Sequence, residues 1–332
     1  MSRHAATGGG AADDDSGGPA YNVIEKENLG ATWDCGDRPL QCVGDYVEFI
    51  DLARAYADRI PLPELWGEIS ACTRDRVPLF VDPEPAEMLR AQIVKALNLG
   101  FLVDGLDERP LVATTIRVDE ADTYTETEVL FTDPWVGTFE GILLVPKGEG
   151  PFPAVLAIHG HDDTAAIYRD DYHGGDYPAH GYAILMLTMR AMGLDLGQSE
   201  HWIARELMLA GFDLIGLRVY ESMLGLKYLR YLPEIDDARI GLIGHSGGSS
   251  ASNLTVRVDP GIAAYVSDYN VDYCEWGTPW EPYHCETAPD VYPYYPLIRD
   301  FSTCATPVLQ VPYRYTNGMG EIFAFFDEWL MP

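Results

Sequence analysis

The sequence has few basic residues, and lysine is the rarest of them. Against 52 acidic residues the 332-residue chain carries 22 basic ones, four of them lysine, and its formal net charge is −30. Such a charge repels nucleic acid and anionic membranes, so we expect neither as a partner. An acidic, lysine-poor surface suits high salt, but a genome that favours arginine over lysine yields the same composition. Both explanations stay open.

Long apolar runs and metal-binding motifs are also missing. Because no stretch of about 18 apolar residues occurs, we expect no membrane span. No Cys-x-x-Cys or His-Glu-x-x-His spacing occurs, so we expect neither a metal nor a cofactor. Residues 1–20 are polar and glycine-rich, without the apolar core of a signal peptide, and predict a disordered tail. The oligomeric state has no signature in the sequence.

The six cysteines do not settle the compartment. Cys35 and Cys42 lie seven residues apart, and Cys274 and Cys285 lie eleven apart, so either pair could close a disulfide in an extracytoplasmic protein. Six reduced cysteines in a cytosolic enzyme are the alternative.

Strand-like and helix-like segments alternate along the second half of the chain. Three segments rich in β-branched residues (111–118, 126–131 and 139–146) predict an antiparallel edge. Apolar runs then predict buried strands, and 3.6-residue spacing predicts helices at 213–232 and 321–330. Together they predict an α/β fold with a mostly parallel sheet and helices on both faces. The buried strands are expected at 152–161, 182–189, 239–244, 261–269 and 306–313.

The first hundred residues have a different pattern. Apolar residues at helical spacing within 45–100 predict a helical N-terminal extension over 21–110, followed by a catalytic domain over 111–332. Gly100 is the expected C-cap of the last helix in this extension.

The segment ARIGLIGHSGG carries the chemistry. An apolar run leads into a Gly-x-Ser-x-Gly motif made by Gly244, Ser246 and Gly248, and a helix-compatible stretch follows. A serine on a sharp strand-to-helix turn sits above the sheet, where bulky neighbours would clash, and faces the amides of the helix N-terminus. The motif therefore predicts Ser246 as a nucleophile at such an elbow.

These residues resemble the α/β-hydrolase superfamily, in particular its dienelactone hydrolases and acetyl-xylan-esterase-like proteins. The resemblance covers roughly residues 110–332 and rests on AVLAIHGH, TMRAMG, IDDARIGLIGHSGG and the final FAFFDEWL. It implies a serine nucleophile, an oxyanion hole and an ester or related acyl substrate. The backbone amides of Gly247 and of His161, in the turn after the first buried strand, are the expected oxyanion donors.

The base departs from the superfamily pattern. The resemblance places a histidine near the C-terminus, but no histidine follows His284, as if the loops that bear acid and base were shortened. His284 is therefore the expected base, and Asp268, at the end of the strand after the nucleophile, is its expected partner. His245, adjacent to the serine, is expected to be structural. His173, His180 and His201 remain rival bases, and a solvated role for Asp268 remains open.

The sequence thus predicts a serine-dependent carboxylic-ester hydrolase that acts on a small-molecule ester through an acyl-enzyme. A degenerate hydrolase that binds a ligand without turnover is the alternative from another class, and a peptidase is the enzymatic one.

Overall fold

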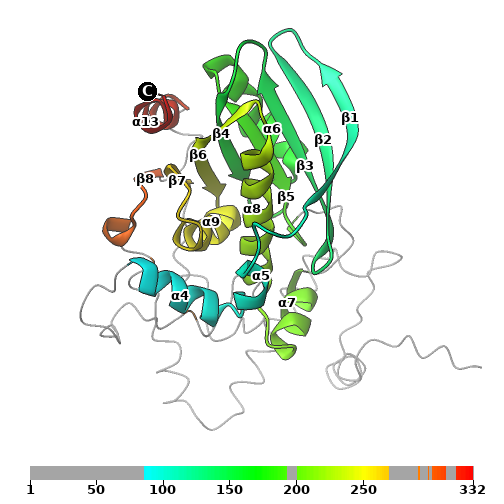
Figure 1. Cartoon of the computed structure of the whole chain (residues 1–332), viewed down its shortest axis with the longest axis vertical. Helices are drawn as coiled ribbons and strands as arrows, with labels where there is room; N and C mark the ends of the chain where they lie inside the picture. The colour runs from blue at the N-terminus through cyan, green and yellow to red at the C-terminus, as the bar shows by residue number, and fades with distance from the viewer. Residues whose placement is uncertain are drawn as a thin grey trace, which may run out of the picture.

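One mixed sheet of eight strands forms the core of the molecule (Figure 1). The computed structural model describes residues 86–192, 200–268, 291, 298, 301–311 and 319–331. Across the sheet the order is β1-β2-β3-β5-β4-β6-β7-β8. The strands are β1 (Val112–Glu120), β2 (Tyr124–Asp133), β3 (Gly137–Pro146), β4 (Phe152–Ile158), β5 (Ala183–Thr188), β6 (Ile235–His245), β7 (Ala264–Asp268) and β8 (Val308–Val311).

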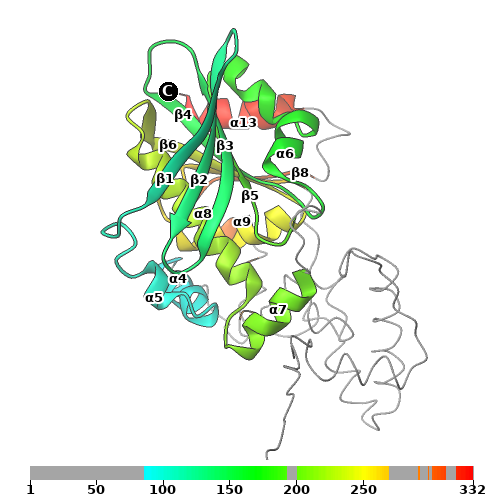
Figure 2. The ribbon, with the colours of Figure 1, turned by 90° about the vertical axis from the view of Figure 1, so that its right-hand side faces the viewer.

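The sheet divides into an antiparallel and a parallel part. Strands β1, β2 and β3 run antiparallel side by side (Figure 2), and β3 pairs antiparallel with β5. From β5 through β4, β6 and β7 to β8 every pairing is parallel. The predicted antiparallel edge and mostly parallel sheet are thus confirmed, with each predicted strand in place.

Helices cover both faces of the sheet, as predicted. Leu156 of β4 packs with α4, α8 and α9 on one face, whereas its neighbours Val155 and Ala157 pack with α6, α13 and the 3-10 helix η2 on the other. The helices are α4 (Ala86–Ala96), α5 (Gly100–Val103), α6 (Ala165–Asp171), η2 (Gly174–His180), α7 (Glu200–Leu209), α8 (Leu214–Tyr231), α9 (Gly247–Val258), the short 3-10 helix η5 (Phe301–Thr303) and α13 (Gly320–Leu330).

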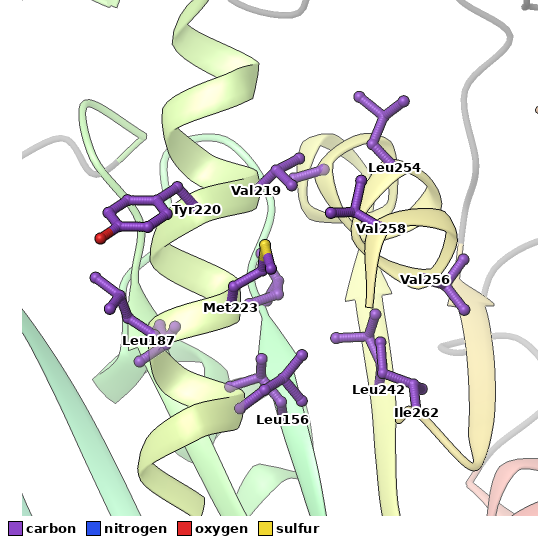
Figure 3. Close-up of a cluster of buried hydrophobic side chains, with 14 of the residues drawn as sticks. Leu156, Leu187, Val219, Tyr220, Met223, Leu242, Leu254, Val256, Val258 and Ile262 are labelled. Carbon is purple, nitrogen blue, oxygen red and sulfur yellow. The ribbon is translucent and has the colours of Figure 1, made fainter. Parts of the chain in front are cut away.

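The larger core lies under α8 and α9 (Figure 3). Side chains of these helices, such as Val219, Met223 and Leu254, meet Leu156 and Leu242 of the strands beneath. Full burial of one such side chain stabilises the fold by about 1.5–3 kcal/mol. Helix α9 is buried at all of its twelve residues, so the segment that follows the candidate nucleophile is fixed by the core.

The predicted N-terminal extension is described only from residue 86 onward. Helix α4 packs on α9 through Leu89 and Ile93. The predicted C-cap at Gly100 is wrong: the chain turns at Asn98, whose φ is 53°, and Gly100 begins α5. Asparagine tolerates this left-handed conformation better than most residues. Residues 1–85 lie outside the described part, so the tail and the boundaries of the extension stay predictions.

No helix among the described residues is long and apolar enough to cross a bilayer.

Candidate active site

Ser246 occupies the turn between β6 and α9. Its backbone has φ 50° and ψ −119°, a conformation that is rare for a residue with a side chain. Such strain costs on the order of 1–3 kcal/mol and persists only where the surroundings impose it. The turn places Ser246 at the carboxyl end of a central strand and directly before the first amide of α9. This is the geometry of a nucleophile elbow.

Glycines let the elbow pack this tightly. A Cβ atom on Gly244 would lie 2.5 Å from the carbonyl oxygen of Gly248 and 2.5 Å from Oγ of Ser252. A Cβ atom on Gly248 would overlap the carbonyls at the end of β4. Real Cβ atoms do not come this close to other atoms, so the glycines of the motif are steric requirements of the turn.

The turn after β4 lies against Ser246. A Cβ atom on Gly160 would lie 3.1 Å from the Cβ atom of Ser246. Two residues later Asp162 adopts φ 64°, and its amide donates to the carbonyl of Met192, 2.7 Å away. The structure thus brings His161 and Gly247, the predicted oxyanion donors, onto the two segments that adjoin Ser246.

His159 holds this turn but is not placed for proton transfer. Its buried Nε2 accepts from the amide of Met189 at 2.9 Å, so the ring proton resides on Nδ1, which donates to the carbonyl of Gly160 at 2.7 Å. Burial lowers the pKa of His159 to about 4, so the ring is neutral at pH 7. Nε2 thus ties this turn to the residue that follows β5, and Nδ1 is engaged within the turn itself.

Asp268 is linked to the elbow by three hydrogen bonds. Its fully buried carboxylate lies 2.9 Å from Nδ1 of His245 through Oδ2. Its carbonyl oxygen accepts from the amide of Ser246 at 3.0 Å and from the hydroxyl of Ser249 at 2.8 Å. The sequence analysis missed the pair with His245. The signal was the register of β6 and β7, which places His245 directly beside Asp268.

Two of the candidate bases are not described by the structure. His284 is outside the described residues, as is the side chain of His201, so the Asp268–His284 pair stays a prediction. The rivals His173 and His180 have other partners: His173 pairs with Asp176 at 2.9 Å, and His180 stacks on Phe323 at 3.7 Å between ring centroids.

The part of the chain that the structure describes contains no metal cluster and no disulfide. No group of three or more histidine, cysteine, aspartate or glutamate side chains there could hold a metal ion. Cys304 is the one cysteine it includes, with a free thiol. Both candidate disulfides, Cys35–Cys42 and Cys274–Cys285, fall outside it.

Comparisons with known proteins find a hydrolase and esterases among the similar sequences. No protein-family model matches the sequence. Over 190 residues, 54% of the chain, it is 28% identical to the Bacillus subtilis protein named "Putative hydrolase YtaP" and covers 63% of that protein. Over 131 residues, 40% of the chain, it is 31% identical to Esterase FrsA of Klebsiella pneumoniae and covers 27% of it. The chain thus spans less than two thirds of the length of these relatives.

Solved structures extend the likeness to the fold. A protein of Bacteroides fragilis, described as a putative acetyl xylan esterase, matches with a TM-score of 0.60 and 18% identity over 74% of each chain. Acetyl Xylan Esterase 1 from Thermoanaerobacterium sp. JW/SL YS485 matches with a TM-score of 0.53 and 15% identity, covering 76% of this chain and 100% of that one. The chain therefore has the α/β-hydrolase fold, with acetyl xylan esterases and related hydrolases as its structural neighbours.

Proposed function

We propose that this chain is a serine-dependent carboxylic-ester hydrolase that works through an acyl-enzyme. The observation that carries the proposal is the strained backbone of Ser246 at the elbow between β6 and α9, with the Gly160 turn packed against it. Strain of this kind persists at sites where it serves a function. The esterases and hydrolases among the relatives support the same chemistry.

The reaction follows from the elbow. The hydroxyl of Ser246 attacks the carbonyl carbon of the ester, a base takes its proton, and a tetrahedral oxyanion forms. The amides of Gly247 and His161 donate to that oxyanion. Collapse of the intermediate expels the alcohol, which receives the proton from the base, and water then hydrolyses the acyl-enzyme with the same base.

We assign the base to His284 and its acidic partner to Asp268. Asp268 ends the strand next to the nucleophile strand, and its buried carboxylate is within one residue of the elbow in the strand register. A carboxylate there would orient an imidazole and stabilise its charged form during the reaction. The proposal gives Asp268 two histidine partners, because His245 already contacts Oδ2.

The substrate class is a small-molecule carboxylic ester. This class rests on the names of a relative and a structural neighbour, Esterase FrsA and Acetyl Xylan Esterase 1. Chromogenic p-nitrophenyl acetate is therefore a suitable probe, and a peptide p-nitroanilide tests the peptidase alternative.

The deciding experiment combines turnover with covalent labelling. Wild type should hydrolyse p-nitrophenyl acetate and react with a fluorophosphonate, whereas Ser246→Ala should lose both, with a rate loss on the order of 10³-fold or more. Ser250→Ala is the matched control: this serine lies one turn into the same helix, is buried, and its hydroxyl has no hydrogen-bond partner among the described residues. A wild-type protein that binds esters but neither turns over nor labels would identify the degenerate binder.

A further inference from the structure

One carboxylate connects the Gly160 turn to two helices beyond the sheet. Oε1 of Glu200, the first residue of α7, lies 3.2 Å from Nε2 of His161. The same oxygen accepts from the guanidinium of Arg218, a fully buried residue of α8. Glu200 therefore bridges the turn that borders Ser246 and the core of the protein.

The network continues into the turn after β5. Arg218 donates to the carbonyl of Arg190 at 3.0 and 3.2 Å. Arg190 in turn pairs with the buried Glu221 at 2.6 Å and donates to the carbonyl of Val136 at 2.6 Å. These charges are paired and hydrogen-bonded, which is the condition under which charge is tolerated in an interior.

The turns that this network joins are both strained. Asp162, next to His161, has φ 64°, and Ala191, next to Arg190, has φ 56°. A positive φ in a residue with a side chain is held only by its surroundings. For the turn after β4, those surroundings include the hydrogen bond from Asp162 to Met192 and the contact of His161 with Glu200.

The described side chains of helix α7 pack in a small cluster. Ala204 lies there with Ala191 and Leu214, and Ile203 and Leu207 pack against them, apart from the two main cores. The ion pair with Arg218 ties the carboxylate of Glu200 to the core of the protein.

We propose that Glu200 is a positioning residue of the ester hydrolysis: through the imidazole of His161 it holds the backbone amide of His161 where the oxyanion forms. The inference rests on the proposed function. An oxyanion donor has to lie about 2.7–3.1 Å from the developing charge, so a small shift of the turn weakens transition-state binding. Substrate binding in the ground state does not depend on that contact. Loss of Glu200 should accordingly lower kcat and leave KM unchanged.

The test uses the full chain and p-nitrophenyl acetate. We expect Glu200→Ala to lower kcat by about 10-fold or more at constant KM, because the turn loses its anchor. Glu200→Gln, whose amide oxygen still accepts from both partners, should restore most of kcat. Asp236→Ala removes the carboxylate of a surface pair with Arg239 at the start of β6, the end opposite Ser246, and should leave kcat and KM at wild-type values. Equal activity of Glu200→Ala and wild type, or a change in KM alone, would overturn the proposal.

A double-mutant cycle with His161 separates an effect on positioning from an effect on stability. It is needed because Glu200→Ala also removes the carboxylate that pairs with the buried Arg218. His161→Ala keeps the Glu200–Arg218 pair and the backbone amide, and should cost about the same factor in kcat without a comparable loss of thermal stability. The double variant should be no slower than Glu200→Ala. Multiplicative losses would mean that Glu200 does not act through His161. If wild type itself neither turns over nor labels at Ser246, the proposed function fails; if wild type is active and these variants are too, only the inference fails.

Discussion

The pair His245–Asp268 and the pair His161–Glu200 flank Ser246 on either side of β6, and they are built differently. The first joins the ends of two parallel strands, and its side chains are 6% and 0% exposed. The second joins a turn to the start of helix α7, and its side chains are 29% and 16% exposed. We therefore expect one side of Ser246 to be fixed by the sheet and the other to be adjustable, so the removal of each pair should affect different quantities.

The largest effect is expected at Asp268. Asn is nearly isosteric and still accepts through its amide oxygen, so Asp268→Asn should keep the fold while removing the charge that stabilises an imidazolium. We expect a loss in kcat on the order of 10³-fold or more, with a small change in thermal midpoint.

The control for Asp268 is Asp259→Asn. Asp259 follows the C-terminal end of α9, and its buried carboxylate pairs with Arg230 at 2.8 Å. Its kcat should stay at the wild-type value. Near-normal kcat for Asp268→Asn would reduce Asp268 to a structural partner of His245 and remove the acid from the proposed mechanism.

The next effect is a pH dependence of stability that comes from His159, which belongs to neither pair. Because the folded protein keeps this ring neutral, with a pKa of about 4 against 6.5 unfolded, the unfolded state binds more protons between these values. The stability contributed by the neutral ring is complete above pH 6.5 and falls as the pH drops toward 4, by about 3 kcal/mol in all.

Urea unfolding of wild type and His159→Gln at pH 7, 6 and 5 measures this contribution. Wild type should lose stability faster than the variant as the pH falls. Parallel curves would show that His159 titrates normally in the folded protein.

The two pairs themselves should differ in stability. His245→Phe keeps an aromatic ring against Tyr172, which packs at 4.8 Å, but removes a donor to a buried carboxylate, at a cost of about 1–3 kcal/mol. His161→Phe breaks a partly exposed pair and should cost less than about 1 kcal/mol. Denaturant midpoints give both values, and equal losses would erase the contrast between a fixed and an adjustable side.

The sequence predicted the strands and the elbow better than the two pairs beside Ser246. Apolar runs located every strand, and the Gly-x-Ser-x-Gly spacing located the elbow, because both are local patterns with fixed steric meaning. His245–Asp268 joins residues 23 apart and needs the register of two strands, which an order of strands alone does not fix. Glu200 is harder still: it lies 39 residues after His161 on α7, a helix that the sequence analysis did not predict. His284, the predicted base, lies outside the described residues.

The smallest effect concerns salt. The acidic side chains behind the net charge of −30 repel one another in the folded state. At 1 M salt the Debye length is only about 3 Å. Screening should therefore raise the thermal midpoint by a few degrees between low salt and molar NaCl. A flat or falling midpoint would favour the genome-composition explanation of the acidic surface.

The same salt titration sharpens the comparison of the two pairs, because solvent ions reach the partly exposed His161–Glu200 contact and not the buried His245–Asp268 contact. The stability difference between wild type and His161→Phe should therefore shrink in molar salt, whereas that between wild type and His245→Phe should persist. If both differences shrink alike, the two sides of Ser246 are equally open to solvent, and the division into a fixed and an adjustable side does not hold.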